Sequence, residues 1–463
     1  MLNPMKLLKK NSDILIYLLV VSYFVMMAFL TVLKHATFHS NACDMALCDQ
    51  IVSNILHGKG PYITFLNKNY LNEHLSLIFF LLAPFYLIYD SPETLLIIQA
   101  LFLALGALPI YLLAKHVIKD KLSALIFSFI YLISSQLLEA IFFDFHLESF
   151  IPFFLIFAFY SGLKKHYICY FICMILAFLV REDVALYGIA IGLYFLIVEK
   201  NRKIGIVTTL AGIIWFGLVI RYIRHGVLET RYTYLGTDFS SILKTIILNP
   251  FVPLKHIFIN SGLPALKLFF KMGFLPFFNL PTLALSFFPL STTMLSNYTS
   301  QYTLYAEYSI PVLTFLYIGS VYGFAKISNF SWQHREIKLR NLILFMIILI
   351  NIFCLFRFIY RVDKRWFVKD THVEIGSIAL SKISEGVSVS AQTNFLPHLS
   401  RHEKNYLFPN INDAEYIIID TKGNKWPLGK DEYFRKVREV QKNKTYNTIY
   451  SNDGIIVFKR SEN

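Results

Sequence analysis

Carboxylate side chains recur in short polar segments that interrupt long apolar stretches of this 463-residue chain. The first such segment contains Asp44 and Asp49, which are five positions apart. A carboxylate at a reaction centre can act as a general base and remove a proton from an acceptor hydroxyl. In a helix the two side chains would point about 140° apart, so we expect only one of them to face a given site. The alternative for Asp44 is a charge that favours the start of a helix continuing to Ile55.

Metal binding is the chemistry indicated by a second segment, Asp144-Phe145-His146-Leu147-Glu148. In an extended backbone, Asp144, His146 and Glu148 would lie on one side. Carboxylate and imidazole groups can together bind Mg²⁺ or Mn²⁺, and such a cation would neutralise a phosphate or pyrophosphate leaving group. The alternative is two charges at helix ends with a hydrogen-bonded histidine between them.

Phosphate recognition is the chemistry indicated by a third segment, Arg181-Glu182-Asp183, which joins two apolar stretches with almost no linker. A guanidinium group matches the geometry of a phosphate, so this segment is a candidate for substrate binding. The alternative is an internal ion pair between Arg181 and one of the two carboxylates that follow it.

Five further polar residues are candidates for substrate contacts. Glu73 and His74 precede one apolar stretch, where they would complete the site or cap a helix. Gln301, Tyr305 and Glu307 precede another apolar stretch. The alternative for Tyr305 is a position at the membrane interface, where tyrosine is common.

The elements that position these residues are predicted to be membrane helices. The chain is 56% hydrophobic and only 16% charged, and apolar runs of roughly 20 residues, the length that crosses a bilayer, recur along it. We therefore predict an all-α polytopic membrane protein with about 11 transmembrane helices. The expected spans are 13–33, 92–114, 122–141, 149–163, 167–180, 184–198, 204–222, two passes within 250–290, 308–325 and 341–361.

The formal net charge of +14 reflects membrane topology rather than nucleic-acid binding. Basic residues gather in short connections, among them Lys115, Lys119 and Lys121 in one and Lys164 and Lys165 in another. Placing these connections in the cytoplasm satisfies the positive-inside rule. This topology predicts a multi-pass protein of the cytoplasmic membrane with a cytoplasmic N-terminus, and it puts the three acidic segments on the extracytoplasmic face. Ionisable groups beside lipid tend to be functional.

The first external loop is predicted to extend over about residues 34–91. Its apolar part, residues 75–89, is expected to lie along the outer membrane interface or to re-enter. If it were a span, the basic connection at Lys115 would lie outside the cytoplasm, against the positive-inside rule. Cys43 and Cys48 lie in the same loop. A disulfide between them and two free thiols are both compatible with their spacing.

The composition changes after the last span. Residues 366–463 are polar, with short β-rich runs at 387–390, 416–420 and 454–458 and a helical segment at about 430–441. We predict two domains: a transmembrane domain, residues 1–365, and a small extracytoplasmic α/β domain, residues 366–463. The second domain could grip an acceptor or could be a plain folded appendage.

These residues together resemble the GT-C superfamily of membrane glycosyltransferases. In that superfamily an Asp of the first external loop acts at the catalytic centre, and Asp44 corresponds to it. A D-x-D or D-x-E motif often occupies the second external loop, where this chain has Asp144 followed by His146 and Glu148. The spacing here, D-x-H-x-E, departs from that motif.

The chain is also identified as a member of a prokaryotic membrane family described as domain of unknown function number twenty seventy-nine. Residues similar to that family's pattern occur at 44–50, 72–76, 144–148, 181–183, 295–298 with 301–302, and 397–401. The chain departs from the pattern at three positions: Glu73 stands where Asp is usual, Arg181 where Lys is usual and Glu307 where His is common.

The resemblance implies a GT-C-like fold and transfer of a sugar from a polyprenyl-phosphate-linked donor to an extracytoplasmic glycan, lipid or protein acceptor. The partners expected are the lipid-linked donor, membrane lipid and the acceptor, with a divalent cation, Mg²⁺ or Mn²⁺, as the candidate cofactor. Two other hypotheses stay open. One is a transporter or flippase for a charged or lipid-linked solute, and the other is a non-catalytic scaffold that binds a partner through its C-terminal domain.

Overall fold

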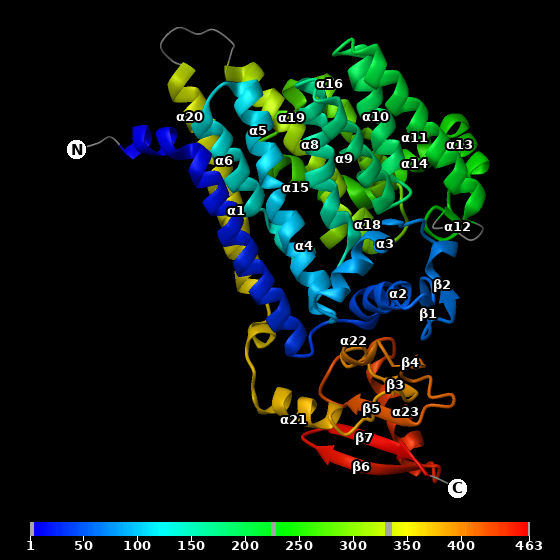
Figure 1. Ribbon diagram of the computed structural model, residues 1–463. Helices are drawn as coiled ribbons and strands as arrows, with labels where there is room; N and C mark the ends of the chain where they lie inside the picture. The colour runs from blue at the N-terminus through cyan, green and yellow to red at the C-terminus, as the bar shows by residue number, and fades with distance from the viewer. Residues whose placement is uncertain (1–3, 224–227, 329–335, 403, 462–463) are drawn as a thin grey trace. The chain divides into compact units, whose positions relative to one another are not determined.

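The computed structural model describes residues 4–223, 228–328, 336–402 and 404–461. The chain is mostly helical and divides into two compact units (Figure 1). The first, here called the helical unit, comprises Met1–Met27, Asn72–Ile78 and Gln99–Val362. The second, here called the mixed unit, comprises Ala28–Leu71, Phe79–Ile98 and Asp363–Asn463.

The helical unit is built from apolar helices joined by short turns. Lys119, Lys165 and Lys200 adopt positive φ values of 62°, 60° and 53° in three of these turns, a left-handed conformation that is common just after a helix ends. The chain consequently reverses direction at each of them. The helices in and around these turns are α5 (Ala107–Ile118), α6 (Lys121–Leu132), α7 (Ser135–Phe142), α8 (Ile151–Leu163), α9 (Tyr167–Val180), α10 (Val184–Ile197) and α11 (Arg202–Tyr222).

Five helices in the described residues are long and apolar enough to cross a membrane, or up to seven if two bent pairs each count as one span. The five are Lys9–Ala36, Glu93–Ile118, Arg202–Tyr222, Ala306–Ser328 and Arg340–Arg361. They match predicted spans. Two of them lie within α1 (Pro4–Ala36) and α20 (Glu336–Arg361), and Ala306–Ser328 combines η8 (Ala306–Ser309) with α19 (Ile310–Ser328). Phe29, Ile214 and Phe353, on three of these five helices, are exposed, as expected for side chains that face lipid.

Three further predicted spans are shorter apolar helices at the predicted places. Segments 149–163, 167–180 and 184–198 are apolar helices of 10–17 residues. Segment 75–89, which was expected to lie along the membrane interface or to re-enter, contains the short helical stretch Ile78–Leu87, formed by α3 (Ile78–Leu82) and η3 (Ala83–Leu87).

The region 250–290 does not contain two continuous helices. Its first half is one helical rod made of α14 (Phe251–His256), η5 (Ile257–Ser261) and α15 (Gly262–Lys271). The rest is broken into short helices, which are η6 (Leu275–Phe278), α16 (Leu280–Leu283), η7 (Ala284–Ser286) and α17 (Phe287–Met294). Two of them, η6 and α16, have a proline at their first positions, where its missing N–H is tolerated and favours a new start.

Two glycines on α19 let the broken region pack closely. Side-chain atoms of Pro276 lie near the position that a Cβ of Gly319 would occupy, at 3.1 Å. A Cβ at Gly323 would overlap the carbonyl oxygen of Leu275. Small residues at helix contacts allow such close backbone approach in membrane proteins, so these glycines position η6 against α19.

The mixed unit contains a five-stranded sheet of order β4-β3-β5-β7-β6 (Figure 1). Strand β3 pairs in parallel with β4 and β5, and β7 pairs antiparallel with β5 and β6. The C-terminal sheet expected from the sequence is confirmed, although β4 and β6 were not predicted. The strands are β3 (Val389–Ala391), β4 (Asn405–Leu407), β5 (Tyr416–Asp420), β6 (Tyr446–Asn452) and β7 (Ile455–Arg460).

Helices α21 (Thr371–Leu380), α22 (Leu396–Leu399) and α23 (Lys430–Lys442) accompany this sheet. One face of the sheet packs against α23 through a buried core that includes Ile417, Ile419, Tyr433, Val437 and Phe458. The same unit holds the first part of the predicted first external loop. This part forms the π-helical turn η1 (Ala42–Ala46), α2 (Leu47–Leu56) and a hairpin of β1 (Tyr62–Ile63) with β2 (Lys68–Asn69).

Candidate functional site

The loop that carries Asp144 and His146 is held by one buried glutamine of the helical unit. Gln99 Nε2 donates to the carbonyl oxygen of Asp144 at 2.7 Å, and Gln99 Oε1 accepts from the backbone N–H of His146 at 2.6 Å. Asp144 has a φ of 119°, a value that few residues other than glycine adopt. Strained backbone of this kind often occurs at functional sites, and here Gln99 stabilises it.

The extended alternation predicted for residues 144–148 stops at His146. Residues Leu147–Phe150 form the 3₁₀ helix η4, which turns Glu148 toward Arg181, and their side chains form an ion pair. No group of three His, Cys, Asp or Glu side chains in the described part of the chain is placed to hold a metal ion. The expected set of Asp144, His146 and Glu148 is therefore not assembled as a three-ligand site.

Arg181 is engaged by carboxylates on both sides. Its Nε and Nη2 donate to Asp183 Oδ1 and Oδ2 at 2.9 and 3.1 Å, while Nη1 contacts Glu148. Tyr187 Oη donates to Asp183 at 2.7 Å. Burial opposes the charged guanidinium, but Asp183 and Glu148 outweigh it and raise the pKa of Arg181 well above its usual value. The internal ion pair, one of the two alternatives for this segment, is thus what the structure contains.

Glu182 points to a different partner. Its Oε1 lies 2.8 Å from His74 Nδ1, and its Oε2 is buried without a hydrogen-bond partner among the described residues. Burial favours the protonated acid, but the His74 imidazole more than compensates and lowers the pKa of Glu182 to about 2. The predicted residues His74 and Glu182 therefore form a half-buried hydrogen-bonded pair, and half-buried Glu73 precedes His74 in the chain.

His146 and Glu307 face each other in the same unit. His146 Nε2 lies 3.8 Å from Glu307 Oε2, and the imidazole stacks on Phe143. Glu307 is buried in the first turn of η8 (Ala306–Ser309). Tyr305, which packs edge-on against Phe143, remains 45% exposed and is accessible to a ligand.

Arg231 is a further charged residue of the helical unit, and the sequence did not predict it as a site residue. It ends the short helix α12 (Leu228–Arg231), and its guanidinium contacts the rings of both Tyr298 and Tyr308, 4.8 and 5.3 Å from their centroids. Nη1 donates to Gln301 Oε1 at 2.8 Å. Among the residues that the structure describes, Arg231 forms no ion pair. The signal available in the sequence was an arginine on the predicted outer side, where basic residues are rare.

The charged groups of the helical unit converge on one tyrosine. Glu307, Arg231, Arg181 and Glu148 all lie close enough to act electrostatically on the Tyr308 hydroxyl. Buried Gln301 also donates to the carbonyl oxygen of Thr292 at 3.0 Å, which fixes its orientation. We call this group the charged cluster; it consists of His74, His146, Glu148, Arg181, Glu182, Asp183, Arg231, Gln301, Glu307 and Tyr308.

The two predicted catalytic aspartates lie in the mixed unit. Asp49 is fully buried and accepts hydrogen bonds from Tyr86 Oη at 2.7 Å and Ser400 Oγ at 2.5 Å. Its carboxylate also meets the guanidinium of Arg401, with Nη2 2.9 Å from Oδ1. Every oxygen of Asp49 is thus committed within the protein, which is the environment of a structural carboxylate.

Asp44 has a different environment. It is half-buried in the first turn of η1, and α2 continues the helical path to Leu56. Burial, followed by the Asp44 charge, raises the pKa of the Cys43 thiol to about 11. Cys43 and Cys48 are free thiols in the structure. Asp44 is half-buried whereas Asp49 is fully buried, so Asp44 is the more accessible of the two predicted bases.

The family match covers almost the whole chain. Residues 34–457 match the family described as "Predicted membrane protein (DUF2079)". The chain belongs to this family. No curated protein sequence matches it.

The fold is similar to that of ArnT from Cupriavidus metallidurans, a glycosyltransferase of the GT-C superfamily. The crystal structure of ArnT bound to undecaprenyl phosphate matches with a TM-score of 0.54 and 13% sequence identity, covering 95% of this chain and 97% of that one. The apo structure matches with a TM-score of 0.51 over the same shares. The GT-C-like fold expected from the sequence is therefore confirmed.

Proposed function

We propose that the chain is a membrane glycosyltransferase that takes a sugar from a polyprenyl-phosphate carrier and transfers it to an extracytoplasmic acceptor. The observation that carries this proposal is Arg231, a guanidinium that forms no ion pair among the described residues and is held by the rings of Tyr298 and Tyr308. The likeness in fold to ArnT, which was crystallised with undecaprenyl phosphate, supports a lipid phosphate as its ligand.

In the proposed reaction an acceptor oxygen forms a bond to the anomeric carbon of the sugar, and the bond from that carbon to the phosphate oxygen breaks. Arg231 would meet the charge that develops on the departing phosphate. Tyr298 and Tyr308 hold its guanidinium by cation–π contacts, so little reorganisation is needed when the phosphate binds. Arg181, in contrast, would position Glu148 and Asp183, because both carboxylates already pair with its guanidinium.

The acceptor hydroxyl must lose its proton in this reaction. Asp44 is proposed as the general base that removes it, and this role is tested separately from that of Arg231. A general base typically contributes about 10²–10⁴-fold to a rate, so Asp44→Asn should leave the protein folded but nearly inactive. The predicted divalent cation needs its own test. If a chelator abolishes product formation and added Mn²⁺ or Mg²⁺ restores it, the reaction uses a divalent cation.

The membrane topology proposed here has about 11 passes, a cytoplasmic N-terminus and an extracytoplasmic domain at 366–463. The turns of Lys119, Lys165 and Lys200 support it, because short turns between antiparallel helices put these lysines at the end of the helical unit opposite to the Arg181 turn. In a cysteine-free background, Lys444→Cys should react with an impermeant maleimide in intact cells. Lys165→Cys should react only after permeabilisation.

A deletion strain complemented with single variants tests the transferase proposal. We expect wild type to restore a missing envelope glycan or glycolipid, Arg231→Ala to fail and Arg231→Lys to restore it in part. Arg435→Ala, which removes an exposed arginine of α23, is the matched control and should restore it fully. Restoration by Arg231→Ala at equal membrane abundance would overturn the proposal and favour transport or a scaffold role.

Binding of the carrier gives a second measurement. Purified protein should bind undecaprenyl phosphate, and Arg231→Ala should weaken this binding about 10- to 100-fold, the value of a charged hydrogen bond. Equal binding by wild type and Arg231→Ala would show that the phosphate is held elsewhere.

A further inference from the structure

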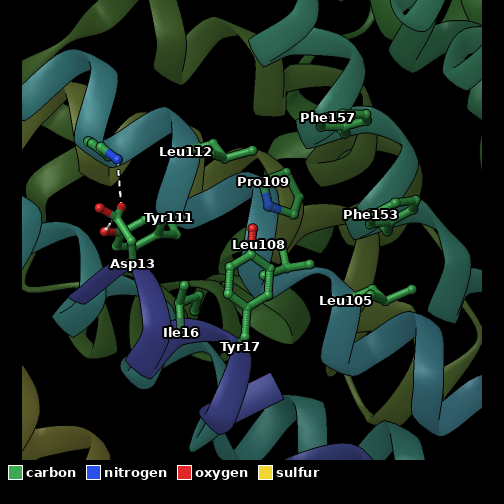
Figure 2. A pocket seen from close by; sticks show the side chains of 11 residues that line it. Asp13, Ile16, Tyr17, Leu105, Leu108, Pro109, Tyr111, Leu112, Phe153 and Phe157 are labelled. Atoms are coloured by element: carbon green, nitrogen blue, oxygen red, sulfur yellow. Dashed lines mark hydrogen bonds and ion pairs between the residues drawn. The ribbon is translucent and has the colours of Figure 1, made fainter. Parts of the chain in front are cut away.

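An apolar pocket lies at the opposite end of the helical unit from the charged cluster. The pocket, of about 460 Å³, opens between α1, the junction of α4 (Glu93–Leu105) with α5, and α8. Its walls include Leu105, Leu108, Leu112, Phe153 and Phe157, which are all half-buried. Figure 2 shows apolar side chains on one side of this pocket and Asp13 with Tyr111 on the other.

The pocket is apolar along its length and charged at one end. Asp13 accepts hydrogen bonds from Tyr111 Oη at 2.7 Å, Lys115 Nζ at 2.6 Å and Lys121 Nζ at 2.5 Å. Two ammonium groups thus face one carboxylate, which leaves one positive charge in excess. Among the described residues Asp13 is the only hydrogen-bond acceptor for either ammonium group, and each group has three donors. Donors therefore remain for an external anion.

The surrounding charges reinforce this excess. Lys9 pairs with Asp120 at 2.8 Å, and Arg340 lies 4.0 Å from the same carboxylate. Lys119 stands in the turn between Lys115 and Lys121. Counting these groups together, five basic side chains (Lys9, Lys115, Lys119, Lys121 and Arg340) surround two acidic ones (Asp13 and Asp120).

We propose that this pocket binds an anionic phospholipid, with one acyl chain against Leu108 and Phe157 and the phosphate beside Lys115 and Lys121. Basic pockets between helices on the cytoplasmic side of membrane proteins suit anionic headgroups. An apolar solute would not use the charged end, and a zwitterionic lipid would gain less from the excess positive charge. The site is separate from Arg231, so it does not depend on the proposed transferase activity.

The charge balance makes a prediction with a definite sign. Lys121→Ala removes the excess positive charge while Lys115 still neutralises Asp13, and it should weaken binding of phosphatidylglycerol. Asp13→Asn increases the excess from one charge to two and should strengthen it. One basic side chain near an anionic membrane surface contributes about 1 kcal/mol, so each change should be on the order of five-fold. Both effects should shrink at high salt.

The experiment uses delipidated full-length protein in mild detergent and native mass spectrometry with two lipids of identical chains, phosphatidylglycerol and phosphatidylcholine. We expect preferential retention of phosphatidylglycerol, with the two charge variants shifting it in opposite directions. Leu108→Trp, which fills the pocket without changing charge, should reduce retention of phosphatidylglycerol. Lys255→Ala, which removes an exposed lysine elsewhere in the helical unit, should not.

Two results would overturn the proposal. Equal retention of both lipids, unchanged by Leu108→Trp and Lys121→Ala, would mean an ordinary lipid annulus. Displacement of phosphatidylglycerol by undecaprenyl phosphate with the same variant dependence would mean that the pocket holds the carrier instead. Failure here is distinguishable from failure of the transferase proposal, because the complementation assay with Arg231→Ala is independent of this pocket.

Discussion

Arg401 Nη2 lies 2.9 Å from Asp49 Oδ1, and Arg401 Nε lies 3.2 Å from Asp49 Oδ2, so guanidinium and carboxylate meet through two parallel contacts. The two residues are 352 positions apart in the chain. The pair joins two segments that resemble the family pattern, residues 44–50 and 397–401, within the mixed unit. Gln50 strengthens the same junction by donating to the carbonyl oxygen of Ser400 at 3.0 Å.

Breaking this pair should destabilise the mixed unit strongly. Arg401→Ala leaves the fully buried Asp49 carboxylate without its counter-charge, and such a loss typically costs about 3–5 kcal/mol. Thermal unfolding or protease resistance of the full chain in detergent measures it. The matched control is Arg365→Ala, which removes an exposed arginine paired with Asp363 and should change stability by less than about 1 kcal/mol. Equal effects of the two variants would contradict a structural role for Arg401.

Arg181 should not tolerate replacement by lysine. Arg181→Lys keeps the charge but cannot contact Glu148 and both oxygens of Asp183 at once, because an ammonium lacks the planar fork of a guanidinium. We expect lower stability and lower complementation than wild type. A double-mutant cycle of Arg181→Ala with Asp183→Ala should give a coupling of about 0.5–3 kcal/mol. Additive effects of the two substitutions would show that the ion pair contributes nothing.

His372 should make the stability of the mixed unit depend on pH. Its Nδ1 and Nε2 lie 2.7 Å from Asp453 and 3.1 Å from Asp420. Burial opposes the charged imidazolium, but the hydrogen bonds to the two carboxylates outweigh it and raise the pKa of His372. The stabilisation is therefore fully present below the unfolded pKa of about 6.5 and is lost as pH rises through the folded pKa.

Unfolding of the full-length wild type and His372→Gln across this range measures the effect. The wild type should exceed the variant most at about pH 5.5 and by progressively less as the pH rises above the folded pKa. A difference that is constant with pH, or that grows as pH rises, would contradict a charged His372 between two carboxylates.

Gly323 should be essential for the packing of α19 against η6, whereas Gly217 of α11 should tolerate a larger side chain. Gly323→Ala places a Cβ on the carbonyl oxygen of Leu275, which the backbone of η6 must move to relieve, at about 1–3 kcal/mol. A Cβ at Gly217 of α11 would meet no atom within 4 Å. Gly217→Ala should therefore be neutral or stabilise the helix slightly. Thermal unfolding of both variants at equal detergent concentration compares them, and equal stability would contradict the close packing of α19 against η6.

Much of the local structure follows from the sequence alone. Apolar runs such as 204–222 and 341–361 can satisfy their backbone polar groups in a membrane only as helices, so their composition predicts their form. The β-rich run 416–420 and the charged run 430–441 likewise became β5 and α23. Near 144–148 this local reasoning failed, because Leu147 begins a 3₁₀ helix and ends the expected alternation.

Only the tertiary structure decided which charged side chains pair with one another. Composition and spacing identified Asp49, Glu148 and Glu182 as notable carboxylates, and the resemblance supplied the family motifs around them. Their partners Arg401, Arg181 and His74 come from distant segments, and nothing in the local sequence selects one cation over another. Arg231 was missed for the same reason, since its tyrosine neighbours lie more than sixty positions along the chain. Hydrophobic patterning acts over one helix and can be read locally, whereas ion pairing depends on which helix ends the packing brings together.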